Sequence, residues 1–79
     1  MSIESNEGGV VPRRLWPVAR GLAEGLENGQ IAERCLLARH TVEDYVHQLK
    51  ERLGEPNRVK LAIWCNEMVE NGDFAERAT

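Results

Sequence analysis

Hydrophobic residues recur along much of the chain at steps of three and four positions, the spacing that lines one face of a helix. The first such series begins after Val10 and contains Leu15, Val18, Ala19, Leu22 and Leu26. Pro17 is tolerated in the first turn of a helix and disrupts its interior, so it fixes where this segment starts. We therefore expect a first helix at about residues 15–25.

Two shorter-range signals predict the second and third helices. Asn28 is a suitable N-cap for a helix at about residues 28–35, whose apolar positions are Ile31, Ala32 and Cys35. The helical spacing then resumes at Val42, Val46, Leu49 and Leu53. Gly54 is a typical left-handed C-cap and Pro56 prevents continuation, which gives a third helix at about residues 39–53.

The fourth helix, expected at about residues 57–71, is apolar at eight of the thirteen positions from 58 to 70. These apolar residues form two stripes, one of Val59, Ala62 and Ile63 and another of Leu61, Trp64, Cys65 and Met68. A half-buried helix needs only one apolar stripe. We expect the second stripe to need a partner, although a small core that wraps more of the helix would explain it as well.

The length of 79 residues allows one small domain. No strand-like alternation or internal repeat is present, so the predicted fold is all-α with four helices. We expect the helical domain at residues 10–72, a disordered tail or linker remnant at residues 1–9, and a C-terminal tail at residues 73–79.

The net charge of −3 argues against a general nucleic-acid binder, because affinity for phosphates comes largely from Lys and Arg. Any DNA binding must depend on a local group of basic residues. No apolar run is long enough to span a membrane, and the N-terminus lacks the features of a signal peptide. We therefore expect a cytoplasmic protein without a membrane partner.

The chain contains two cysteines, Cys35 and Cys65, and both fall within apolar patterns. They are expected to be packing residues of a reducing compartment. A zinc site built from these cysteines with His40 and His47 is the alternative, but the compact ligand spacing of such sites is missing. No catalytic residues, metal site or cofactor are predicted, so an enzyme is not expected.

The chain resembles the LuxR/GerE type of helix-turn-helix, the C-terminal DNA-binding domain of many bacterial response and quorum-sensing regulators. The resemblance covers about residues 10–70 without gaps. Its motifs are Glu24-Gly25-Leu26, Ile31-Ala32-Glu33-Arg34, Leu37, Thr41-Val42, Leu49, Arg52-Leu53-Gly54 and Asn57-Arg58.

This resemblance implies that the third helix lies in the major groove of double-stranded DNA and that the fourth forms a homodimer, so that two copies read two half-sites. Thr41 and Arg52 match family positions that contact the phosphate backbone. The full set of expected DNA contacts is Arg39, His40, Thr41, Glu43, Asp44, His47, Lys50 and Arg52, and the expected dimer contacts are Leu61, Trp64, Cys65 and Met68.

The chain departs from the family pattern where it should touch bases. Positions 43 and 47 are often basic in the family but are Glu43 and His47 here. A second acidic residue, Asp44, directly follows Glu43. Ala38 replaces the usual Ser at the helix cap, and Leu36 occupies a turn position often taken by Gly. A pair between Glu43 and His47, four residues apart, would reduce the repulsion from phosphates.

Three interpretations of the acidic pair remain open. Its carboxylates can accept hydrogen bonds from the exocyclic amine of cytosine. They can bind a basic partner, which would make the protein an antiactivator that mimics DNA and blocks another transcription regulator. They can also be an ordinary solvated surface near a helix N-terminus. We favour a sequence-specific DNA-binding transcription regulator, with the antiactivator as the alternative.

Overall fold

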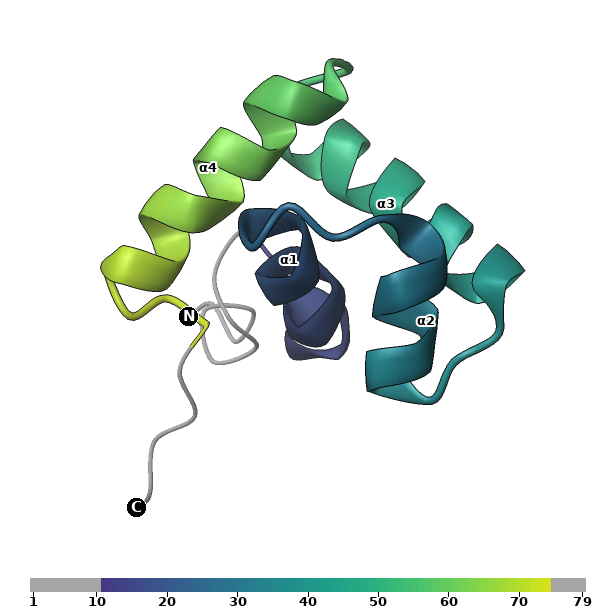
Figure 1. Cartoon of the computed structure of the whole chain (residues 1–79). Coiled ribbons are helices and arrows are strands. Elements are labelled where there is room, and N and C mark those ends of the chain that lie inside the picture. The colour runs from purple at the N-terminus through teal and green to yellow at the C-terminus, as the bar shows by residue number, and fades with distance from the viewer. Residues whose placement is uncertain (1–10, 75–79) are drawn as a thin grey trace, which may run out of the picture.

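The computed structural model describes residues 11–74 and places four α-helices around one core (Figure 1). A 3-10 turn, η2 (Arg13–Leu15), precedes α1 (Trp16–Ala23), α2 (Asn28–Cys35), α3 (Arg39–Leu53) and α4 (Arg58–Glu70). Residues 11–74 contain no strand. The predicted all-α, four-helix fold is thus confirmed. The tail expected at residues 1–9 lies outside the described residues.

The helix bounds agree closely with those expected from the sequence. The predicted ranges of α2 and α3 are those observed, while α1 and α4 are each shorter by one or two residues at their ends. Pro17 lies in the first turn of α1, as its missing N–H requires. Gly54 ends α3 in the left-handed conformation with φ 67°, which confirms its role as a C-cap.

The start of α2 differs from the expected cap. Glu27, not Asn28, is the N-cap, and its backbone N–H donates to the Gln30 side chain at 2.9 Å. The Asn28 side chain instead accepts a hydrogen bond of 2.8 Å from the Arg58 guanidinium, which also donates to the Leu26 carbonyl. Asn28 was therefore wrong as a cap because it joins α2 to the first turn of α4.

The turn between α2 and α3 contains two residues that are unfavourable for their backbone positions. Leu36 has φ 59° and is the one residue other than glycine with positive φ within residues 11–74. Its side chain is 91% exposed, so packing does not offset this strain. Ala38 is the N-cap of α3 and offers no side-chain hydrogen bond. The turn is held instead by a backbone hydrogen bond of 3.0 Å from the Leu37 N–H to the Ala32 carbonyl and by the packing of Leu37 against the core.

Leu36→Gly should stabilise the protein relative to Leu36→Ala. The left-handed conformation costs a residue with a Cβ about 1–2 kcal/mol, whereas the extra freedom of glycine in the unfolded chain costs about 0.5–1 kcal/mol. We expect the free energy of unfolding, measured in urea, to be about 0.5–1 kcal/mol higher for the Gly variant. An Ala variant as stable as the Gly variant would show that the turn is unstrained.

The core lies around α1, which is in the middle of the molecule with α4 on one side and α2 on the other (Figure 1). Gly21 lets α2 approach closely, because a Cβ there would lie 2.7 Å from the Ile31 side chain. The buried apolar residues come from every element and are Val11, Leu15, Trp16, Val18, Ala19, Leu22, Ile31, Ala32, Val42, Val46, Leu49, Leu61, Cys65 and Phe74.

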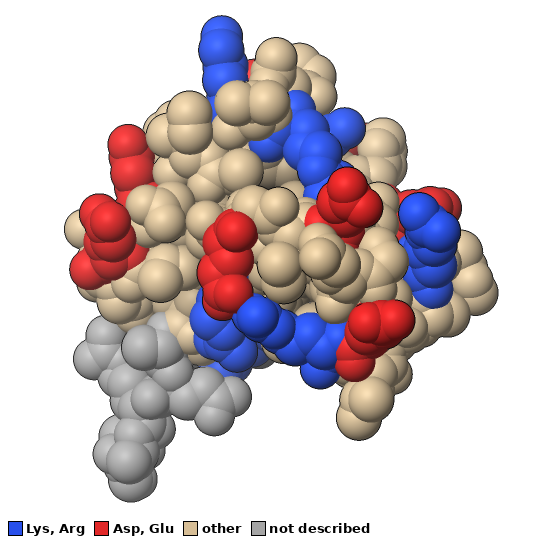
Figure 2. All heavy atoms as spheres, viewed as in Figure 1, with Lys and Arg blue, Asp and Glu red and all other residues tan. Residues whose placement is uncertain are grey.

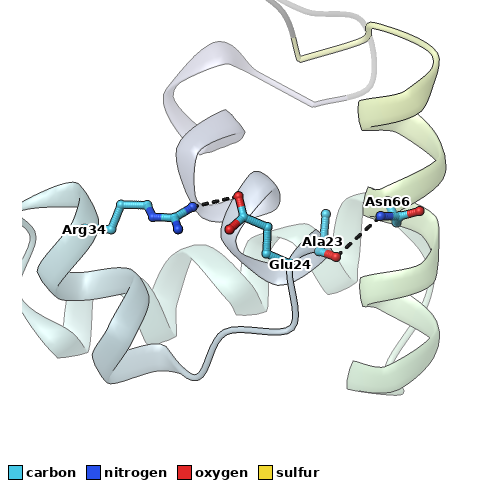
Figure 3. Close-up of polar contacts among 4 residues, drawn as sticks. All are labelled: Ala23, Glu24, Arg34 and Asn66. Carbon is cyan, nitrogen blue, oxygen red and sulfur yellow. Dashed lines mark hydrogen bonds and ion pairs between the residues drawn. The ribbon is translucent and has the colours of Figure 1, made fainter.

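Two polar contacts at the end of α1 connect it to its neighbours (Figure 3). The Arg34 guanidinium of α2 pairs with the Glu24 carboxylate at 2.7 Å, and the Asn66 amide of α4 donates to the Ala23 carbonyl at 3.5 Å. The hydrogen bond from Arg34 lowers the pKa of Glu24 below its ordinary value of 4.5. Because the folded-state pKa is depressed, the pair stabilises the fold above pH 4.5 and is lost as the pH falls below that value.

The domain extends past its expected C-terminal boundary at residue 72. Phe74 is buried, its ring centroid lies 5.9 Å from that of Trp16, and its carbonyl accepts a hydrogen bond from the Arg20 guanidinium. Gly72 adopts φ 83° and turns the chain back toward α1 after α4 ends. The assignment of residues 73–79 to a tail was thus wrong for Phe74, while residues 75–79 lie outside the described part of the chain.

Candidate nucleic-acid interface

The outer face of α3 consists of residues that point away from the core, namely His40, Glu43, Asp44, His47 and Glu51, and all five are exposed. Val42, Val46 and Leu49 occupy the opposite side of the helix and are buried. The period of 3.6 residues explains this division, since the buried residues recur at steps of four and three. The side chains expected to meet bases therefore face solvent.

The remaining expected contacts lie beside this outer face. Arg39 and Arg52 are exposed, while Thr41 and Lys50 are half-buried. Each residue advances 100° around a helix, so Arg39 and Lys50 lie along one edge of the outer face. Thr41 and Arg52 lie along the other edge, again eleven residues apart. The outer face is thus bordered on each side by residues that can contact phosphate.

The ion pairs on α3 differ from the expected one. Glu43 pairs with Arg39 at 4.0 Å, and the His47 ring pairs with Glu51 at 3.1 Å. The expected pair between Glu43 and His47 is therefore not formed. Each of the two residues instead pairs with a different residue one turn away, and for Glu43 that partner is a guanidinium, which always carries its charge.

A chain of hydrogen bonds reaches the outer face from the start of the domain. Arg14, in η2, donates to the side-chain oxygen of Gln48 at 2.9 Å, and the Gln48 amide nitrogen donates to an Asp44 carboxylate oxygen at 3.0 Å. Arg14 and Gln48 were not among the contacts expected from the sequence. Only the step of four residues from Asp44 to Gln48 could have indicated part of this arrangement.

Positive charge is not concentrated on the face of the molecule that Figure 2 shows. On the face seen in Figure 2, Lys and Arg side chains occur in small groups next to Asp and Glu, and neither sign forms a continuous patch. Along α3, Arg39, Lys50 and Arg52 are accompanied by Glu43, Asp44 and Glu51. The local group of cations that DNA binding requires is therefore small.

The expected dimer interface on α4 is wrong in part. Leu61 and Cys65 are fully buried in the core of the same chain, and Met68 is half-buried against it. These three side chains pack into the core of the same chain, as expected if a small core wraps more of the helix. Burial raises the pKa of Cys65 to about 11, so it remains a thiol at neutral pH.

The apolar side chains that α4 exposes belong mainly to the other stripe. Val59 is 71% exposed, Ile63 55% and Trp64 47%. A groove of about 670 Å³ between the end of α1 and α4 is lined by Leu26, Val59 and Ile63, among others. The exposed apolar surface of α4 is therefore formed by Val59, Ile63, Trp64 and Val69, which is 38% exposed, and of these only Trp64 was expected.

Neither a metal site nor a membrane span is seen in residues 11–74. No three His, Cys, Asp or Glu side chains there come together in a way that could hold a metal ion, so Cys35, His40, His47 and Cys65 do not converge. No helix in the same range is long and apolar enough to cross a bilayer.

A short helix, a tight turn and a second helix with an exposed outer face, supported by flanking helices, define a helix-turn-helix domain of the kind found in DNA-binding transcription regulators. Residues 12–65 match the family model described as "Bacterial regulatory proteins, luxR family", and the chain belongs to this family. The resemblance inferred from the sequence is thus confirmed.

One relative gives the scale of this similarity. The DNA-binding transcriptional activator DevR/DosR of Mycobacterium tuberculosis (strain ATCC 25618 / H37Rv) is 45% identical over 47 residues, which are 60% of this chain and 22% of that protein. The chain thus corresponds to about a fifth of the relative's length. No solved structure matches the chain.

Proposed function

We propose that the protein is a sequence-specific transcription regulator that places α3 in the major groove of double-stranded DNA. The observation that carries this proposal is the exposure of Glu43, Asp44 and His47 on the outer face of a helix-turn-helix domain. A major groove accommodates an α-helix, and side chains on its outer side reach base edges. Such a regulator would act in the cytoplasm, where bacterial DNA is accessible.

Phosphate contacts would come from the two edges of the outer face. Arg39 and Lys50 would meet one strand, and Thr41 and Arg52 the other, because these pairs border the face on opposite sides. His40 lies on the outer face within the first turn of α3 and would approach the groove as well. Arg39 already contacts Glu43, so part of its charge is compensated before DNA arrives.

The direct test is an anisotropy titration of labelled genomic fragments at low salt. We expect binding with a shallow salt dependence, because few cations meet the backbone and each contributes to the slope. A folded protein that binds no fragment at low salt would contradict the proposal. Circular dichroism on the same sample establishes that the helices are formed.

We further propose that two copies associate through the exposed apolar surface of α4. Val59, Ile63 and Trp64 present side chains that a lone domain leaves in water, and the groove beside them could receive side chains of a second copy. Half-buried Met68 would contribute at the edge, whereas Leu61 and Cys65 would support the helix from within. A symmetric contact of this kind would set the spacing of two α3 helices.

Trp64→Glu is expected to shift the protein to a monomer, because a carboxylate would have to be buried in the apolar contact. Sedimentation equilibrium measures the molecular mass in solution and so distinguishes a monomer from a dimer. Leu36→Glu, which changes an equally apolar exposed residue in the turn between α2 and α3, should leave the dimer intact. A wild type that is monomeric at high concentration, or a Trp64 variant that remains dimeric, contradicts this assignment.

The alternative function is an antiactivator whose α3 binds the basic surface of another transcription regulator. Glu43, Asp44 and Glu51 all lie exposed on the outer face, which is the observation that favours it. It predicts that a regulator with a basic DNA-binding face is captured at low salt and released as ionic strength rises. If the protein binds DNA in the absence of any regulator, with an affinity similar to that for the regulator, the antiactivator function is excluded.

A further inference from the structure

Gln48 holds Asp44 in one orientation on the outer face of α3. Its side-chain oxygen accepts from Arg14 at 2.9 Å, and its amide nitrogen donates to one Asp44 oxygen at 3.0 Å. Arg can only donate and an ionised Asp can only accept, so the two neighbours together determine which end of the amide faces each of them. The chain of three side chains therefore fixes the position of the carboxylate.

Asp44 differs in this respect from the other carboxylates of the outer face. Glu43 and Glu51 pair with Arg39 and His47 on α3 itself, whereas Asp44 is connected through Gln48 to a residue of η2. Within residues 11–74, its hydrogen bond from Gln48 uses Oδ2 and no other side chain donates to Oδ1. A fixed acceptor directed to solvent is suited to selecting among hydrogen-bond donors.

We infer that Asp44 determines specificity by accepting a hydrogen bond from the exocyclic amine of cytosine, with Gln48 and Arg14 as positioning residues. This inference rests on the proposed binding of α3 in the major groove. There, guanine presents two acceptors, and thymine an acceptor and a methyl group. Adenine presents a donor beside the N7 acceptor, whereas cytosine presents its amine donor, so a carboxylate favours cytosine.

The positive charge of Arg14 makes this arrangement compatible with a polyanion. A carboxylate near phosphates is repelled, and a guanidinium two hydrogen bonds away reduces that repulsion without occupying the free oxygen. Among residues 11–74, Glu51 on the same helix has His47 as its only side-chain partner. The base preference should therefore depend on Asp44, Gln48 and Arg14 and not on Glu51.

The test is selection from a randomised duplex library, followed by competition titrations with single-base changes in the selected site. For the wild type we expect one position at which cytosine is preferred over thymine by about 10- to 100-fold. Asp44→Asn should change that preference to adenine, because an amide both donates to N7 and accepts from the adenine amine. Glu51→Gln removes the same charge from the same face and should retain the preference for cytosine.

The positioning residues Gln48 and Arg14 are tested by the ratio of the affinities for cytosine and thymine at the selected position rather than by overall affinity. Gln48→Ala and Arg14→Ala should each reduce the cytosine preference several-fold, and Arg14→Lys should restore most of it. A wild type that binds DNA without such a position, or an Asp44→Asn variant that keeps the cytosine, overturns the inference and leaves the proposed function standing. If the folded wild type binds no DNA at all, both fail.

Discussion

Replacing Glu43 and Asp44 together with lysine is expected to raise the affinity for double-stranded DNA about tenfold or more at low salt. Both side chains are exposed on the outer face of α3, where two carboxylates would face the nucleic acid in the proposed complex. Each lysine that reaches a phosphate releases counterions, so two of them would steepen the salt dependence by up to about 1.8 in logarithmic slope. The cytosine preference assigned to Asp44 would disappear in the same variant.

A charge-matched control separates a local effect from a general one. Glu33, on α2, and Asp73, after α4, are exposed and do not line the groove beside α4, and changing both to lysine alters the net charge equally. Anisotropy titrations at several salt concentrations should show a much smaller gain for this control. Equal gains for the two variants would mean that only net charge matters, and no gain for the α3 variant would mean that α3 does not face DNA.

Phe74→Ala is expected to lower the free energy of unfolding by about 3–5 kcal/mol. The ring is buried against Trp16, and its removal would leave a cavity beside α1. Small domains are stable by only about 5–15 kcal/mol, so the variant would be close to unfolding. Urea denaturation followed by circular dichroism measures the loss.

The neighbouring residue provides the control for this prediction. Asp73 is exposed, and Asp73→Ala should change stability by less than about 0.5 kcal/mol. If Phe74→Ala were equally mild, the turn at residues 71–74 would not belong to the core. The boundary near residue 72 expected from the sequence would then be correct.

The bounds of α2 and α3 were predictable because local signals fix them. The apolar residues of α3 recur at steps of four and three, and Gly54 with Pro56 ends the helix. The exposed outer face follows from the same period, and four of its five residues, His40, Glu43, Asp44 and His47, were among the contacts expected from the sequence, whereas Glu51 was not. The expected N-cap of α2 was misplaced by one residue because Asn28 and Glu27 are both able to serve as an N-cap.

The orientation of α4 could not be predicted, because eight of thirteen positions are apolar and no polar side identifies the exposed face. Packing against α1 decides that Leu61 and Cys65 point inward and Val59 and Ile63 outward. Contacts between distant segments were equally hidden. Arg14 and Gln48 are 34 residues apart, and Arg20 and Phe74 are 54 apart, so only the folded chain brings them together.

The placement of α3 against DNA is tested most directly by nuclear magnetic resonance. Adding a duplex that carries the selected site to the isotope-labelled protein should shift the amide signals of Glu43, Asp44 and His47 most strongly. Residues on the buried side of α3 should shift less. Binding accompanied by changes confined to α4, with the outer face of α3 unaffected, would contradict this account of how the protein recognises DNA.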